Sequence, residues 1–377
     1  MLVAALPTDA MLPAFPAMAE FFDTSETATQ AVITVFMFGY ALPHLLLGSA
    51  SDRFGRRPII VGGMVVYLLG AVVCLFAQDF QVLLLGRFVQ GMGAAGPTIM
   101  SRAILRDLFS GTQLARYLSF AMVFFTAGPV LAPFIGVIIQ ELFGWRAIFV
   151  FLALVPIALI VMTHYFLPET LEHPDAQALQ WKRILNNSWA FVSDARSYPI
   201  VIILGFAYGN LVSYLSISPV VYMHYFGMTE FGFASIFALI ATVTFGAQYL
   251  NAYLLQRYSP AQLLYSALLF QCALLLVSTL LSLSGLIAIW SASLSFACFF
   301  VVFAFVMANG TALALEPHQK RAGLASSALG FLNLAAGTLL ATALGRFVYG
   351  PLALFIGMSL FSIGSLAVFV IFRQRFL

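Results

Sequence analysis

Apolar segments close to 20 residues long recur from one end of this chain to the other. A helix that crosses a bilayer needs about 20 such residues, because the backbone must satisfy its own hydrogen bonds where water is absent. Hydrophobic residues fill 62% of the 377 positions and charged residues only 8%, whereas about 25% of a soluble domain is charged. The chain is therefore expected to be an all-α, polytopic membrane protein.

The length of the chain predicts about twelve transmembrane helices joined by short loops. Apolar runs and helix breakers place them near 1–22, 29–50, 58–77, 80–104, 113–140, 146–167, 199–226, 231–255, 260–283, 286–313, 321–344 and 350–373. A polar linker, 168–198, separates an N-terminal six-helix half, 1–167, from a C-terminal six-helix half, 199–377. Parallel-repeat transporters have two such halves, with the substrate site between them near the midplane.

Basic residues mark one face of the predicted bundle. All but three of the 17 lysines and arginines fall in loops that alternation places on the same side, together with the C-terminus; the exceptions are Arg87, Arg146 and Arg346. The positive-inside rule makes that side cytoplasmic, as expected for a bacterial-type inner membrane. In the linker, Trp181, Ile184, Leu185 and Trp189 fall near one helical face, which predicts an interfacial helix along the cytoplasmic surface.

Several classes of function are disfavoured by the sequence. The net charge of +3 is spread over loops, so no nucleic-acid partner is expected. Neither lysine lies in a phosphate-binding loop, and the simplest protease and hydrolase motifs are absent, so neither an ATPase nor another enzyme is expected. The three cysteines fall in apolar segments, and we expect no disulfide, metal or cofactor. The first apolar segment predicts a retained helix rather than a cleaved signal.

Asp9 and Arg87 are the charged residues that we place at membrane depth, Arg87 as the only buried cation. Ionisable groups are costly there and mark ion or substrate pathways. Pro13 and Pro16 follow Asp9 and should kink the first helix beside the acid. We hypothesise that Asp9 exchanges a proton as its distance from Arg87 or from substrate changes. A fixed ion pair or a carbonyl clamp is the alternative for Arg87.

Other polar residues in apolar segments are candidates for a substrate cavity, although each could instead bond a neighbouring helix. They are Gln90, Tyr208, Asn210, Tyr214, Gln248, Asn251, Asn309 and Asn333. His44, beside Pro43, is either a proton carrier or a structural histidine. Gly128, Pro129 and Pro133 predict a bend and a close helix contact in the fifth helix, with ordinary small-residue packing as the alternative.

The loop from Gly48 to Pro58 brackets four charges with glycines. Asp52 can pair with a basic residue or a helix N-terminus, and Gly48 and Gly55 permit tight backbone geometry. We predict a cytoplasmic latch that locks one conformation and involves Asp52 with Arg53, Arg56 and Arg57. A topology signal alone would explain the arginines but not the spaced glycines and Asp52.

These residues resemble the major facilitator superfamily of secondary transporters, and in particular its bicyclomycin-resistance branch of drug:proton antiporters. The similarity rests on Asp9–Ala14, the Gly48–Pro58 loop, Arg87–Gly91, Arg106-Asp107, Gly128-Pro129 and Ala322–Ser327. It implies the major facilitator fold, and export of small, often lipophilic compounds in exchange for protons. Under the resemblance Asp9 is a protonation site, Arg87 its coupling partner, and Asp52 a latch contact near Gly323, with Arg102 on the same side.

His44 and Ala10 depart from the pattern of this branch, where a glutamine and a polar or bulky residue are common. Such changes could retune substrate choice. We therefore expect a monomeric exporter whose partners are small-molecule substrates, protons and lipid. The alternatives are a proton-coupled exporter or importer of a specific metabolite or siderophore, and a transport-inactive membrane receptor.

Overall fold

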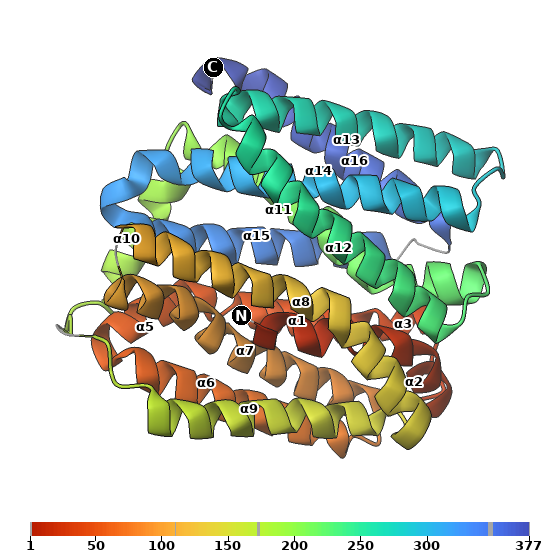
Figure 1. The fold of residues 1–377 in the computed structure, drawn as a ribbon, viewed down its shortest axis with the longest axis horizontal. Helices are drawn as coiled ribbons and strands as arrows, with labels where there is room; N and C mark the ends of the chain where they lie inside the picture. Colours follow the sequence, from red (N-terminus) through yellow and green to blue (C-terminus); the bar gives the residue numbers. More distant parts are fainter. Residues whose placement is uncertain (1, 110, 172–173, 346–349, 377) are drawn as a thin grey trace. The chain divides into compact units, whose positions relative to one another are not determined.

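The fold was analysed in a computed structural model, which describes residues 2–109, 111–171, 174–345 and 350–376. Helices make up its regular structure, and no strand occurs in these ranges (Figure 1). The chain divides into two compact units. The first contains Met1–Ser188 with Ser326–Phe331, and the second contains Trp189–Ala325 with Leu332–Leu377. The domain boundaries expected at 167/168 and 198/199 stay predictions.

The first unit is built from helices that run along its length (Figure 1). In chain order they are α1 (Leu2–Asp9), the 3₁₀ turn η1 (Leu12–Ala14), α2 (Phe15–Phe21), α3 (Glu26–Thr29), α4 (Ala31–Ala41), α5 (His44–Phe54), α6 (Arg56–Leu75), α7 (Phe80–Leu108), α8 (Gly111–Phe143) and α9 (Arg146–Phe166). The predicted single helices over 1–22 and 29–50 are wrong in this respect, because each is broken. Prolines cause both breaks, since they lack the N–H group that the helical ladder needs.

The second unit begins within α10 (Trp181–Val192), which is the helix predicted in the linker. It continues with α11 (Ser197–Pro219), the π-helical turn η2 (Val220–Tyr225), α12 (Glu230–Leu254), α13 (Pro260–Leu283), α14 (Ile289–Leu315), η3 (Glu316–Arg321), α15 (Ala322–Gly345), α16 (Pro351–Phe372) and η4 (Arg373–Arg375). Within this unit α11 and α13 both pack against α16, and α12 packs against α14.

Eight helices in the described ranges are long and apolar enough to cross a membrane, or nine if the pair α4 and α5, bent by 41°, counts as one span. The predicted count of twelve is thus only partly recovered. The first predicted helix is too fragmented to qualify, and α7 carries Arg87, Gln90 and several glycines. Within α8, the apolar part Ala127–Phe143 is too short to count as a membrane span. Gly128, Pro129 and Pro133 lie inside this one continuous helix, and the bend expected there stays a prediction.

Close helix contacts place the middle of α7 at the centre of the first unit. A Cβ atom at Gly91 would overlap the Phe36 carbonyl of α4, and one at Gly93 would overlap the backbone nitrogen of Tyr67 in α6. Gly136 of α8 approaches the Ala10 carbonyl in the same way. The absence of side chains at these positions lets the backbones approach within contact distance. As a result, Arg87 of α7 is enclosed by α1, α4 and α6.

Candidate functional site

The break in the first helix leaves the backbone carbonyl of Pro7 without its usual partner within the helix. The Ala10 N–H still donates to Leu6 O at 3.1 Å, but the Met11 N–H donates to Thr8 O at 3.3 Å. The Pro7 carbonyl, which Met11 would bond in a regular helix, is therefore available to another donor. Pro13 and Pro16 have no N–H group to bond the carbonyls of Asp9 and Leu12. The Leu12 carbonyl instead accepts from the Phe15 N–H, in the tighter geometry of a 3₁₀ turn.

The Arg87 guanidinium occupies this gap and is completely buried. Its Nη2 donates to Pro7 O at 2.8 Å, its Nε to Val32 O at 3.2 Å and its Nη1 to Gln90 Oε1 at 2.6 Å. The guanidinium carbon also lies 4.4 Å from the centre of the Phe36 ring. These contacts join α1, α4 and α7 through one planar fork, which is the geometry that distinguishes arginine from lysine. In this conformation two backbone carbonyls hold Arg87, and its role in coupling stays a prediction.

Asp9 is the last residue of α1 and is also buried. Among the described residues, no ion pair joins it to Arg87. Thr8 Oγ1 lies 3.0 Å from Asp9 Oδ1 and 2.8 Å from Ala5 O. The hydroxyl has one proton, so it can donate to only one of these acceptors at a time. A protonated Asp9 carboxyl satisfies every partner, because it donates to Thr8 while Thr8 donates to the Ala5 carbonyl.

His44 follows the break between α4 and α5 and is buried. Its Nδ1 lies 2.8 Å from the Tyr40 carbonyl, which can only accept, so Nδ1 carries the proton. The Tyr40 ring meets the imidazole edge-on at 4.7 Å. This environment favours the structural alternative over a proton carrier, although the role of His44 stays a prediction.

Three of the seven predicted cavity residues of the second unit lie in side-chain pairs between helices. Asn309 Nδ2 of α14 donates to Asn251 Oδ1 of α12 at 2.8 Å. Asn210 of α11 donates to Ser362 Oγ of α16 at 3.1 Å. Tyr214 is buried among Phe237, Phe296 and Phe300. The remaining candidates are Tyr208, half-buried with its ring edge-on to Phe303, Gln248, which is exposed, and Asn333, which is buried.

Sequence reasoning missed Gln271 of α13, which donates to the same Ser362 hydroxyl at 2.9 Å. The signal was a glutamine in the middle of a long apolar segment, 260–283. Asn210, Gln271 and Ser362 thus form a buried polar junction of three helices.

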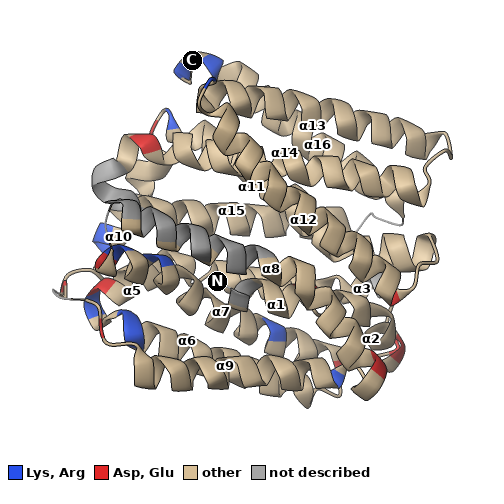
Figure 2. Cartoon of the chain, viewed as in Figure 1, with Lys and Arg blue, Asp and Glu red and all other residues tan. Residues whose placement is uncertain are grey.

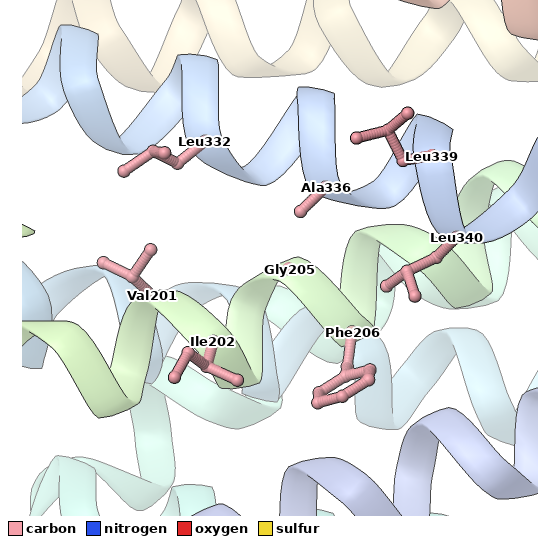
Figure 3. Close-up of a pocket in the computed structure, with 8 residues that line it drawn as sticks. All are labelled: Val201, Ile202, Gly205, Phe206, Leu332, Ala336, Leu339 and Leu340. Atoms are coloured by element: carbon pink, nitrogen blue, oxygen red, sulfur yellow. The ribbon is translucent and has the colours of Figure 1, made fainter.

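An apolar pocket of about 360 Å³ lies between α11 and α15 (Figure 3). Its lining contains only apolar residues and one glycine: Val201, Ile202, Gly205, Phe206, Leu332, Ala336, Leu339 and Leu340. None of the predicted cavity residues lines it, so this pocket and the polar candidates are separate features of the second unit.

The predicted latch loop forms a charged cluster at one end of the first unit, where Figure 2 shows basic residues gathered near α5 and α6. Arg56 is buried, which corrects the expectation that Arg87 is the only buried cation. Its Nη1 bonds Asp52 Oδ1 and Ser51 Oγ, both at 2.6 Å, and its Nε bonds Asp107 Oδ2 at 3.0 Å. One guanidinium thereby connects the ends of α5, α6 and α7, and the desolvation of Arg56 is offset by two carboxylates.

Glu169, which follows α9, caps the start of α6. Its Oε1 accepts from the N–H groups of Arg56, Thr170 and Leu171, at 2.8, 3.0 and 3.0 Å, and its Oε2 accepts from Arg57 N–H at 3.1 Å. The N-cap position itself is Gly55, which has no side chain to provide this bond. Partial burial acts to raise the pKa of Glu169, but the four N–H donors outweigh it and hold that pKa below its ordinary value. We call Asp52, Arg56, Asp107 and Glu169 the α6 cap cluster.

The side chains of the other predicted latch residues lie outside these bonds, and Arg57 contributes only its backbone N–H. Arg57 donates to the His164 carbonyl at 2.8 Å, Arg53 lies over the Phe54 ring, and Arg102 is exposed. Gly323 lies in the first turn of α15, and the predicted contact between it and Asp52 stays a prediction. Sequence reasoning missed Glu169 and the bond of Asp107, because both come from chain segments distant from the loop.

Comparison with known proteins decides the family. The family model described as Major Facilitator Superfamily matches residues 1–345. The chain belongs to this superfamily. The predicted family is thus confirmed, and the protein is a multi-pass membrane transporter rather than an enzyme.

Two bacterial relatives and one solved structure place the chain within the superfamily. The bicyclomycin resistance protein homolog of Haemophilus influenzae is 28% identical over 372 residues, covering 98% of this chain and 92% of that protein. The multidrug resistance protein MdtL of Escherichia coli K12 is 30% identical over 332 residues, covering 88% and 82%. The human organic anion transporter MFSD10 has the same fold, with a TM-score of 0.65 at 18% identity and coverage of 97% and 96%.

Proposed function

We propose that this transporter exports small, often lipophilic compounds across the inner membrane in exchange for protons, by alternating access between its two halves. The names of the relatives support drug efflux, since they are a bicyclomycin resistance protein homolog and a multidrug resistance protein. The distribution of basic residues supports a cytoplasmic C-terminus. The transporter acts as a monomer, with its C-terminal half contributing polar side chains such as Asn333 to the cavity.

One observation carries the coupling mechanism: a buried carboxyl at a helix break, in the same helix as a backbone carbonyl that holds a buried arginine. Arg87 donates to Pro7 O, two residues before Asp9. When Asp9 loses its proton, its carboxylate competes with the neutral Pro7 carbonyl for the guanidinium, because a charged acceptor binds it more strongly. Movement of Arg87 between these acceptors would shift α1 against α4 and α7. Proton release and helix movement are thus coupled.

Substrate enters this cycle as the competitor of the proton. A compound bound beside Asp9 stabilises the deprotonated carboxylate if it is cationic, or displaces the Thr8 contact if it is neutral. The α6 cap cluster closes the cytoplasmic end of the first half in one conformation, with Asp52 as the latch. One proton moving down a gradient of one pH unit supplies about 1.4 kcal/mol, enough for about a tenfold substrate gradient.

Transport in proteoliposomes under an imposed pH gradient tests the proposal. Vesicles with an acidic lumen are given a panel of lipophilic cations and neutral drugs, and substrate uptake is measured together with proton efflux. We expect coupled uptake by the wild type, and loss of coupling in Asp9→Asn and Arg87→Ala. The matched control is Glu141→Gln, which neutralises an exposed carboxylate on α8. Substrate uptake driven by an acidic exterior, with protons entering the vesicles, would instead establish symport, and binding without flux would establish a receptor.

A second candidate is transport of a specific metabolite or siderophore by the same mechanism. The presence of His44, where the drug-exporting branch commonly has a glutamine, favours this candidate. In the same vesicles, this candidate predicts that one metabolite is taken up and inhibits the uptake of every transported drug.

A further inference from the structure

The linker helix α10 has two apolar sides, of which one is exposed. Ile184 and Phe191 are buried. In contrast, Trp181, Leu185 and Trp189 are 62%, 56% and 72% exposed. These three residues are spaced by four positions, so they share a sector of about 80° along the helix. We call Trp181, Leu185 and Trp189 the outer stripe. Large apolar residues in a continuous exposed row indicate an interaction surface.

Both ends of α10 are tied to ends of long apolar helices. Before it, the Asp175 N–H donates to Asp52 O, at the end of α5, at 2.8 Å, and Arg183 Nη1 bonds Asp175 Oδ2 at 2.7 Å. After it, α11 begins at Ser197, and Asp194 accepts the Ser197 N–H at 3.0 Å. The connection from Val192 to Ser197 spans at most about 17 Å. Since α11 is a candidate membrane span, the outer stripe is within reach of the bilayer surface.

The charges on α10 suit an anionic surface. The helix contains no acidic residue, and its basic residues are Lys182 and Arg183. Asp175 neutralises Arg183, while Lys182 is exposed and borders the sector of the outer stripe. Tryptophan is the side chain most enriched at the membrane interface, where its ring meets the acyl boundary and its N–H meets water and headgroups.

We propose that α10 docks on the cytoplasmic leaflet, with the outer stripe inserted at the acyl boundary and Lys182 bound to an anionic phospholipid headgroup. The occupant of this exposed face is thus the phospholipid of the same bilayer. The linker between the two halves is thereby anchored to the membrane, in a position that depends on the content of anionic lipid. This inference does not depend on which compound is transported.

Quenching of tryptophan fluorescence by spin-labelled lipids tests the docking in the full chain. Wild type and the double variant W181F/W189F are reconstituted in phosphatidylcholine vesicles containing lipids labelled near the headgroup or deep in the acyl chain. Their difference reports the outer stripe, because Trp145 and Trp290 are common to both proteins. We expect strong quenching by the shallow label, weaker quenching by the deep label, and little access for aqueous iodide. Retained elution and helicity establish that the variant is folded.

A second quenching experiment tests the anionic headgroup by replacing part of the phosphatidylcholine with phosphatidylglycerol. One lysine near an anionic surface changes a binding equilibrium about fivefold, so phosphatidylglycerol should increase shallow quenching in the wild type and much less in Lys182→Gln. Arg257→Gln is the matched control, because it removes an exposed charge from a loop outside α10. Quenching by iodide instead of lipid would overturn the proposal. Protection from both quenchers would also overturn it, since protein would then cover the stripe.

Discussion

Replacement of Glu169 by alanine removes the group that caps α6 from outside that helix. Gly55 at the N-cap supplies no side chain, so the first N–H groups of α6 lose their acceptor. Loss of a cap costs about 1 kcal/mol, and loss of a negative charge at a helix N-terminus costs about 0.3–1 kcal/mol. Hydrogen bonds to charged groups contribute about 1.5–3 kcal/mol, and the lower part of this range applies because Glu169 is exposed. We therefore expect Glu169→Ala to lower the free energy of unfolding by about 2 kcal/mol in all.

Thermal unfolding in detergent measures this loss. About 2 kcal/mol corresponds to a fall in Tm of about 4–8 °C for a unit of this size. The pKa of Glu169 is lowered in the folded protein, so its stabilisation is present above its ordinary pKa of 4.5 and disappears as the pH falls through the lower, folded value. The wild type should therefore lose its advantage over Glu169→Ala in acid. The reasoning is refuted if both proteins share one Tm at pH 7, or if their difference in acid is as large as it is at pH 7; Glu141→Gln serves as the control for a surface carboxylate.

Two further substitutions test the helix packing and the contacts of the Arg87 guanidinium at the centre of the first unit. Gly136→Ala should lower Tm by several degrees, since the new methyl group overlaps the Ala10 carbonyl, whereas Gly62→Ala on α6, with nothing within 4 Å, should leave it unchanged; equal effects would contradict this packing. Arg87→Lys keeps the charge but cannot reach Pro7 O, Val32 O and Gln90 Oε1 together. We expect it to reduce proton-coupled transport at least tenfold while binding persists, and near-normal transport would show that charge alone suffices.

Much of the fold follows from the sequence, because bilayer thickness sets the length of each apolar segment. The helices α6, α9, α12, α13 and α16 lie close to their predicted ranges. The break at Pro43 was missed, since a proline in an apolar run can be carried within a continuous helix, as Pro129 and Pro133 are in α8. Whether the ladder breaks depends on the neighbouring helices that re-satisfy its carbonyls.

The candidate site was predictable in its residues but not in its contacts. Asp9 and Arg87 stand out because buried charges are rare in membranes. A fixed ion pair was one alternative for Arg87, yet the break after Asp9 presents the Pro7 carbonyl to it instead. Glu169 could not be assigned at all, since a lone acid after α9 looks like any loop residue until the chain returns to α6. Such contacts depend on the packing of distant segments, which periodicity does not specify.

Proton release on substrate binding tests the central claim most directly, that proton and substrate exchange at Asp9. The purified transporter is mixed with a transported compound in weakly buffered detergent solution, and the change in pH is recorded against saturation of binding. The account predicts release of up to about one proton per bound substrate by the wild type. It predicts no release by Asp9→Asn, even where that variant still binds. Equal proton release by both proteins, or binding by the wild type without release at any pH, would contradict it.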